Sequence, residues 1–135
     1  MTPLLILTHG DFGDLLLRAA EQMFGPQSDC AALSLAPDES REDYLQRVKT
    51  TVAPWPQAPL VLVDLACGTP WNSALLAGLA PDAEVLAGLS LPVLLEALEL
   101  RAALAPKALA AELVQRGSQS FARASALMPG GPGNC

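Results

Sequence analysis

The stretch Leu60-Val-Leu-Val63-Asp64 decides the fold that this sequence predicts. Four consecutive apolar residues after Pro59 are typical of a strand that is buried on both faces of a sheet. A short loop over residues 65–68 then leads to Thr69-Pro70, where a hydroxyl cap followed by proline predicts the start of a helix over residues 70–79. A buried strand joined to a helix in this way indicates a parallel α/β sheet.

The rest of the chain alternates between strand and helix in the same manner. The pattern predicts further strands at residues 4–7, 30–35 and 85–89, and further helices at residues 12–24, 40–52, 91–104 and 106–116. Residues 118–127 fit either a last strand or a helix. We therefore expect an α/β fold, with a doubly wound, mainly parallel four-stranded sheet, helices on both faces, and room for an extra C-terminal strand. One domain over residues 1–125 and a flexible Pro/Gly tail over residues 126–135 complete the expected organisation.

Composition argues against several classes of function. The formal net charge of −6 disfavours nucleic acid, whose phosphates require a basic surface. No apolar run approaches the roughly 18 residues of a spanning helix, and the first residues lack the basic region of a signal peptide. Three scattered cysteines suit a reducing compartment, and a single histidine does not favour a zinc site. We therefore expect a cytoplasmic protein without membrane insertion, nucleic acid or bound metal.

Two residues at the ends of predicted strands suggest a catalytic pair. His9, the only histidine in the sequence, ends the first strand region, and Asp64 directly follows the third strand. Parallel sheets bind ligands at the carboxyl ends of their strands. An imidazole accepts a phosphoryl group well when a carboxylate holds its other ring nitrogen. The alternative is that His9 is a surface residue bonded to backbone and that Asp64 is a turn residue.

A second set of residues is suited to binding phosphate. Thr69 and Gly68 stand where the helix after the third strand begins, and free N–H groups at such a helix start attract anions. Gly10 permits close approach to His9, and Ser90 lies after the fourth strand. Each also has a plain structural interpretation: an ordinary helix start for Thr69, a turn for Gly10, and a helix cap for Ser90. Trp71 fits either a docking anchor or a buried ring.

Three segments, in this order, resemble the mannose-type IIA component of the bacterial phosphoenolpyruvate-dependent sugar phosphotransferase system. They are Ile6-Leu-Thr-His-Gly10, Val63-Asp-Leu-Ala-Cys-Gly-Thr-Pro-Trp-Asn72 and Gly88-Leu-Ser-Leu-Pro-Val-Leu-Leu-Glu96. The resemblance covers residues 1–125 and implies a four-stranded parallel sheet and a homodimer, with a final strand exchanged between subunits. The chain departs from the family pattern at Leu7 and Cys67, where glycine is common, and at Ser90, where asparagine is usual.

The resemblance also implies a phosphotransferase role without a cofactor. His9 would take a phosphoryl group from the phosphocarrier HPr, becoming a phosphohistidine, and pass it to a IIB component on a separate chain. Asp64 would hold Nδ1, Nε2 would carry the phosphoryl group, and the Thr69 hydroxyl and nearby amides would receive it.

Other functions stay open at this point. They are a regulatory module of an incomplete phosphotransferase system, the phosphocarrier subunit of a dihydroxyacetone kinase, and a ligand-binding domain that is not phosphorylated. The histidine phosphatase class is disfavoured, because Thr8 replaces its arginine and a second histidine is missing.

Overall fold

The computed structural model describes residues 1–127 and residue 130, and along them the chain alternates between strands and helices. The strands are β1 (Leu4–His9), β2 (Cys30–Leu35), β3 (Leu60–Val63) and β4 (Glu84–Ala87). The helices are α1 (Phe12–Phe24), α2 (Arg41–Val52), α3 (Thr69–Leu76), α4 (Leu91–Leu100), α5 (Pro106–Ser118) and α6 (Ala124–Leu127). All strand pairs are parallel, and the order across the sheet is β2-β1-β3-β4. The predicted α/β class and four-stranded parallel sheet are confirmed.

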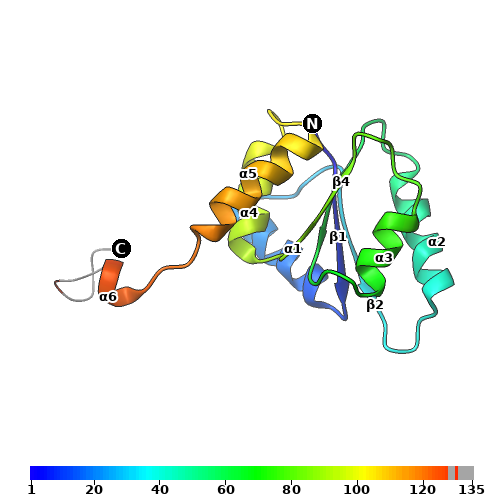
Figure 1. The fold of residues 1–135 in the computed structure, drawn as a ribbon, viewed down its shortest axis with the longest axis horizontal. Helices are drawn as coiled ribbons and strands as arrows, with labels where there is room; N and C mark the ends of the chain where they lie inside the picture. The colour runs from blue at the N-terminus through cyan, green and yellow to red at the C-terminus, as the bar shows by residue number, and fades with distance from the viewer. Residues whose placement is uncertain (128–129, 131–135) are drawn as a thin grey trace.

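Helices cover both faces of the sheet, with α1, α4 and α5 on one side and α2 and α3 on the other (Figure 1). Because successive strand residues point to opposite faces, β1 and β3 each supply apolar side chains to two separate cores. Leu4 and Ile6 pack under α1, α4 and α5, whereas Leu5 and Leu7 pack under α2 and α3. This burial on both sides is why the central strands are uninterrupted apolar runs.

The structure moves the ends of several predicted elements, among them α3, β4 and α4. The helix expected over residues 70–79 is α3, which begins one residue earlier, with Gly68 rather than Thr69 at its cap, and ends at Leu76. The strand expected over residues 85–89 is β4, shifted to Glu84–Ala87. The helix expected over residues 91–104 stops at Leu100.

Arg101 explains why α4 ends early. Its backbone carbonyl accepts a hydrogen bond from the N–H of Thr2, and its buried guanidinium donates to the carbonyls of Ser28 and Asp29. These contacts tie the end of α4 to the loop before β2, so the chain turns there instead of continuing as a helix.

Within the single chain, the described residues form no extra C-terminal strand, and a last strand exchanged between subunits stays a prediction. After α5 the chain leaves the body of the molecule as an arm that ends in the short helix α6 (Figure 1). The Phe121 side chain on this arm is 89% exposed. A strand needs a partner strand, and in this chain the arm lies away from the sheet.

The expected tail over residues 126–135 falls largely on residues 128–129 and 131–135, which lie outside the described part. The domain boundary at residue 125 stays a prediction.

No helix in the described part of the chain is long and apolar enough to span a lipid bilayer.

Candidate functional site

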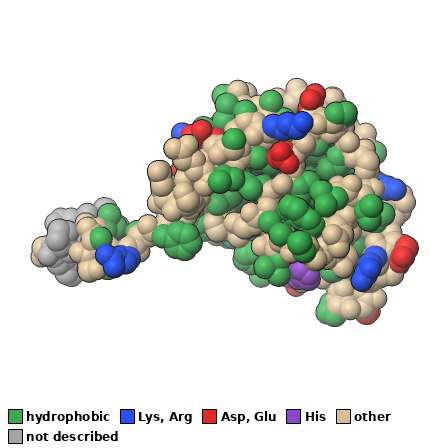
Figure 2. Space-filling model, in the orientation of Figure 1, with side chains coloured by type: hydrophobic (Ala, Val, Ile, Leu, Met, Phe, Trp, Pro, Cys, Tyr) green, Lys and Arg blue, Asp and Glu red, His purple; other side chains and the backbone are tan. Residues whose placement is uncertain are grey.

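His9 and Asp64 meet at the carboxyl end of the sheet, between its two central strands. His9 is the last residue of β1, and Asp64 directly follows β3, whose Val63 pairs with Leu7. The chain runs from β1 to β2 on one side, and β3 lies on the other side of β1. This reversal of strand order is where open α/β sheets bind their ligands. In Figure 2 the single histidine lies at the lower rim of the visible face.

The Asp64 carboxylate holds His9 at two points. Its Oδ2 atom accepts a hydrogen bond of 2.9 Å from the backbone N–H of His9 and lies 2.9 Å from the ring nitrogen Nδ1. Its other oxygen, Oδ1, accepts the N–H of Leu65 at 2.9 Å. Because the carboxylate is an acceptor, the imidazole proton belongs on Nδ1, and the lone pair is left on Nε2. The side chain of His9 is 46% exposed and that of Asp64 only 13%, so the ring is open to solvent while the carboxylate that holds it is mostly buried.

These hydrogen bonds also set the charge of Asp64. Partial burial by itself would raise the pKa of the carboxyl, but the backbone and ring bonds from His9 and the N–H of Leu65 outweigh it. The pKa of Asp64 therefore lies below its ordinary value. The residue is ionised near neutral pH and is suited to balancing positive charge on the His9 ring.

Gly68 lies against the free nitrogen of the histidine. A Cβ atom built on Gly68 would stand 3.0 Å from Cε1 and 3.3 Å from Nε2 of His9, closer than a side chain can pack without displacing the ring. The preceding residue, Cys67, has a φ of +69°, an unusual conformation for a residue with a side chain. The loop is therefore turned tightly, so that the start of α3 comes next to Nε2.

The start of α3 offers hydrogen-bond donors at this point. The N–H groups of Thr69 and Trp71 belong to the first turn, where no intrahelical acceptor exists, and Pro70 has no N–H. Since Gly68 takes the cap position, the Thr69 hydroxyl is not used as a cap, and no hydrogen bond commits it within the described residues. A helix start with free donors and a hydroxyl is suited to an anion.

The other two predicted phosphate-binding residues have structural roles. Gly10 has a φ of +57°, and its N–H donates to the carbonyl of Leu35 at 2.9 Å, so that group is already occupied. Ser90 caps α4, where its hydroxyl accepts the N–H of Val93 at 3.3 Å. The structure thus brings His9, Asp64 and Gly68 together, with Thr69 next to Gly68 in the chain, and it gives Ser90 the plain capping role.

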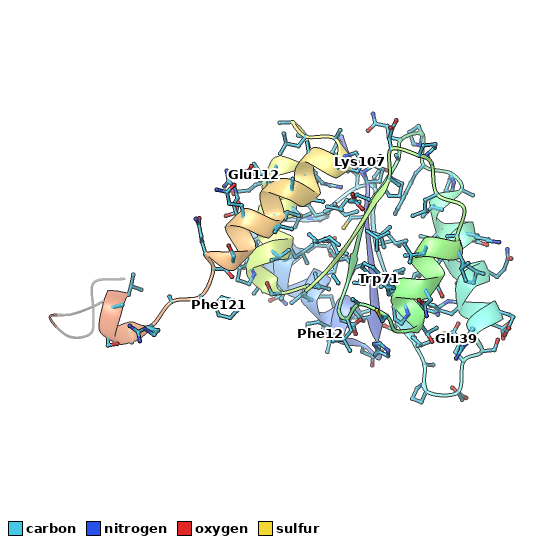
Figure 3. The ribbon with its side chains drawn as sticks, viewed as in Figure 1. Phe12, Glu39, Trp71, Lys107, Glu112 and Phe121 are labelled. Atoms are coloured by element: carbon cyan, nitrogen blue, oxygen red, sulfur yellow. The ribbon has the colours of Figure 1, made fainter. Side chains whose placement is uncertain are left out.

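Apolar side chains flank the site on both faces of the sheet. Phe12 at the start of α1 and Leu65 after β3 are exposed, whereas Trp71 is half buried against the core under α2 and α3. Figure 3 shows Phe12 and Trp71 on opposite sides of β1. Trp71 thus packs against the core with part of its surface exposed, and its role as a docking anchor stays a prediction.

Sequence reasoning missed two residues behind the site, Thr8 and Gly13. Thr8 is fully buried, and its hydroxyl accepts the N–H of Gly13 at 2.9 Å. The signals for this pair were a polar residue at the end of an apolar strand and a glycine in the first turn of a helix. Within the described residues no cluster of three or more His, Cys, Asp or Glu side chains is arranged to hold a metal ion.

The molecule is a doubly wound α/β domain whose switch point carries a histidine held through Nδ1, with Nε2 left open. The family model described as "PTS system fructose IIA component" matches residues 3–114 of the chain. The chain therefore belongs to this family, the mannose-type EIIA components of the sugar phosphotransferase system (PTS), as the resemblance predicted.

Individual relatives agree with this assignment. The chain is 35% identical to the PTS system fructose-specific EIIA component of Bacillus subtilis over 127 residues, which cover 90% of this chain and 85% of that protein. It is 33% identical over 100 residues to a sorbose-specific EIIA component of Klebsiella pneumoniae, with 71% and 72% covered. The crystal structure of an EIIA component from Streptococcus agalactiae superposes with a TM-score of 0.83 at 27% identity, over 93% of this chain and 99% of that one.

Proposed function

We propose that this protein accepts a phosphoryl group from phospho-HPr on Nε2 of His9 and passes it to a IIB component during sugar uptake. The observation that carries the proposal is the 2.9 Å contact between Nδ1 of His9 and the carboxylate of Asp64. It leaves Nε2 as the nucleophile at an exposed position. We place this exchange in the cytoplasm, where phosphoenolpyruvate is available.

The transfer is a direct exchange between two histidines. A bond forms between Nε2 of His9 and phosphorus while the bond from phosphorus to the donor's ring nitrogen breaks, and no proton has to leave His9. The proton stays on Nδ1, where the Asp64 carboxylate balances the positive charge that the phosphorylated ring acquires. The protein then contributes mainly position and electrostatics, as is usual for phosphoryl transfer.

The phosphoryl oxygens would meet the start of α3. A Cβ atom built on Gly68 would stand 3.3 Å from Nε2, and the hydroxyl and N–H of Thr69 follow immediately in the chain. These neutral donors and the helix dipole favour the dianionic group without holding it as a cation would. A carrier needs this balance, because it must release the group to its acceptor.

We also propose that the protein is a homodimer formed along β4. β4 ends the order of the sheet, so its outer edge is unpaired in the single chain. Figure 2 shows hydrophobic side chains gathered on this face, between α3 and α5. Val114 on α5 and Phe121 on the C-terminal arm are exposed apolar residues that line a hollow beside β4. An open apolar sheet edge favours pairing with a second copy.

The intact mass of the protein, after incubation with phosphoenolpyruvate, enzyme I and HPr, tests the carrier function. We expect one added phosphoryl group that mild acid removes, and none on His9→Ala. No added mass in the presence of active HPr would refute the HPr-fed role. Purified phosphorylated protein is then mixed with IIB. Loss of the group to IIB supports transport, whereas stable phosphorylation supports the regulatory alternative.

A further inference from the structure

The turn that follows His9 is held from inside the protein by the hydroxyl of Thr8. This side chain lies on the face of the sheet opposite to the His9 ring, because neighbouring strand residues alternate between faces. Its Oγ1 atom accepts the N–H of Gly13 at 2.9 Å and donates to the carbonyl of Gly10 at 3.1 Å. One buried hydroxyl therefore closes the whole turn between β1 and α1.

The hydroxyl replaces the cap that α1 lacks. Asp11 occupies the cap position of this helix, and its side chain makes no capping hydrogen bond. The N–H of Gly13 belongs to the first turn, where it has no intrahelical acceptor, and Gly13 is buried. Thr8 satisfies that group from the neighbouring strand, so loss of the hydroxyl would leave a buried donor unpaired.

The absence of a side chain at Gly13 leaves room for the Thr8 side chain. A Cβ atom at Gly13 would lie 3.0 Å from both Oγ1 and Cγ2 of Thr8 and 3.0 Å from Cγ2 of Ile6. Only a glycine lets the start of α1 come this close to β1. The threonine and the glycine therefore form an interlocked pair directly behind His9.

The same turn fixes the backbone of His9. The N–H of His9 points to Asp64 on the β3 side, and the next N–H, that of Gly10, points to Leu35 on the β2 side. The peptide groups on both sides of His9 are thus held by Asp64 and Leu35, and the next peptide group, between Gly10 and Asp11, is held by Thr8. This run of hydrogen bonds keeps the backbone that carries the ring in register with Asp64.

We infer that Thr8 is a positioning residue for phosphoryl transfer, which acts by holding the His9 backbone so that Nδ1 stays on Asp64 and Nε2 stays free. The inference rests on the proposed function of His9. It does not make Thr8 a catalytic residue, because its side chain is buried on the opposite face of the sheet.

Three variants test the inference. Thr8→Val keeps the shape and removes the hydroxyl, and Thr8→Ser keeps the hydroxyl and removes the methyl group. Thr2→Val is the matched control, because Thr2 is also buried and its hydroxyl also donates to a backbone carbonyl, that of Leu104, at the opposite end of the sheet. The phosphorylation rate with HPr and the ¹⁵N NMR signals of the His9 ring are measured for each.

For Thr8→Val we expect phosphorylation to be about tenfold slower, which is the change in rate that corresponds to the loss of one hydrogen bond. We also expect the His9 ring to lose its single Nδ1–H tautomer. Thr8→Ser should lie within about twofold of wild type, and Thr2→Val should keep both the rate and the tautomer. Equal losses in Thr8→Val and Thr2→Val, or a serine variant as slow as the valine variant, would reduce Thr8 to a structural role and overturn the inference.

The test also covers a Thr8→Val variant that does not fold and a wild type that is not phosphorylated. If Thr8→Val does not fold, Gly13→Ala takes its place, since its Cβ displaces the Thr8 side chain; an unchanged tautomer and rate there would also overturn the inference. If wild type is not phosphorylated at all, the proposed function fails, but the tautomer in Thr8→Val against Thr2→Val still decides whether Thr8 positions the ring.

Discussion

At the scale of single residues, the arrangement around His9 depends on one carboxylate that binds the backbone and the ring of the same residue. Both bonds reach Oδ2 of Asp64, so the position of the chain and the orientation of the ring are fixed together. Asp64 in turn is held by the N–H of Leu65. The sequence indicated this pair because the two residues end strands that parallel pairing makes neighbours.

Replacing Asp64 by alanine should slow phosphorylation of His9 by about 100-fold, because the ring loses both its orientation and its balancing charge. The fold should persist with a thermal midpoint only a few degrees lower, since the freed N–H groups can bond to water. Time courses with phospho-HPr and circular dichroism melts measure the two effects. Asp38→Ala, at an exposed acid in the loop after β2, is the control and should match wild type. An unchanged rate in Asp64→Ala would remove the orienting role.

The lowered pKa of Asp64 predicts how stability depends on pH. A carboxyl whose pKa is lower in the folded state stabilises the fold above its unfolded pKa, near 3.9, and this contribution is lost as pH falls through the folded value. We expect wild type to be more stable than Asp64→Asn at pH 6, and the difference to shrink as the pH falls from about 4.5 through the folded pKa. Urea unfolding of both proteins across this range measures it. A difference that grows as pH falls would contradict the assigned charge.

At the scale of elements, the loop between β3 and α3 brings a helix start to the reactive nitrogen. Gly68→Ala should slow transfer about tenfold, because a Cβ atom 3.0 Å from Cε1 and 3.3 Å from Nε2 forces the ring or the loop to move. Gly130→Ala, where a Cβ meets no atom of the described residues within 4 Å, is the control and should have no effect. Phosphorylation rates and the ring NMR signals report the displacement. Wild-type values for Gly68→Ala would show that the loop gives way freely.

The elements also show what the sequence could and could not predict. β3 was predicted to the residue because burial on both faces leaves a continuous apolar run, and α1 because Gly25 and Pro26 mark its end. The start of α3 was misplaced by one residue. Thr69-Pro70 fits the cap and the first helical position, but it fits the first two helical positions equally well. Only the turned backbone at Cys67 makes Gly68 the cap.

The features that the sequence did not predict depend on long-range contacts. No local sequence pattern indicates that Arg101 reaches the loop before β2 and ends α4, or that the Thr8 hydroxyl caps α1 from a neighbouring strand. The candidate pair His9 and Asp64 was predictable because both residues end parallel strands, whose carboxyl ends lie at the same edge of the sheet. The residues that support this pair depend on how helices pack on the sheet, which local patterns do not encode.

At the scale of the whole molecule, the carrier has one face that its own chain leaves open. The outer edge of β4, with Val114 on α5 beside it, is not covered by another element of the described chain. A second copy that paired along β4 would bury this surface close to the rim where His9 lies (Figure 2).

The dimer can be tested by placing a charge on this face. Val114→Glu should turn the dimer into a monomer, because a carboxylate buried in an apolar interface costs several kcal/mol, while a helix surface position tolerates glutamate in the monomer. Met23→Glu is the matched control, since Met23 and Val114 are both 60% exposed and Met23 lies on α1, which packs on β2 and not on β4. Size-exclusion chromatography with light scattering gives the mass of each. A wild type that is monomeric at micromolar concentration, or a Val114→Glu variant that stays dimeric, would exclude an interface along β4.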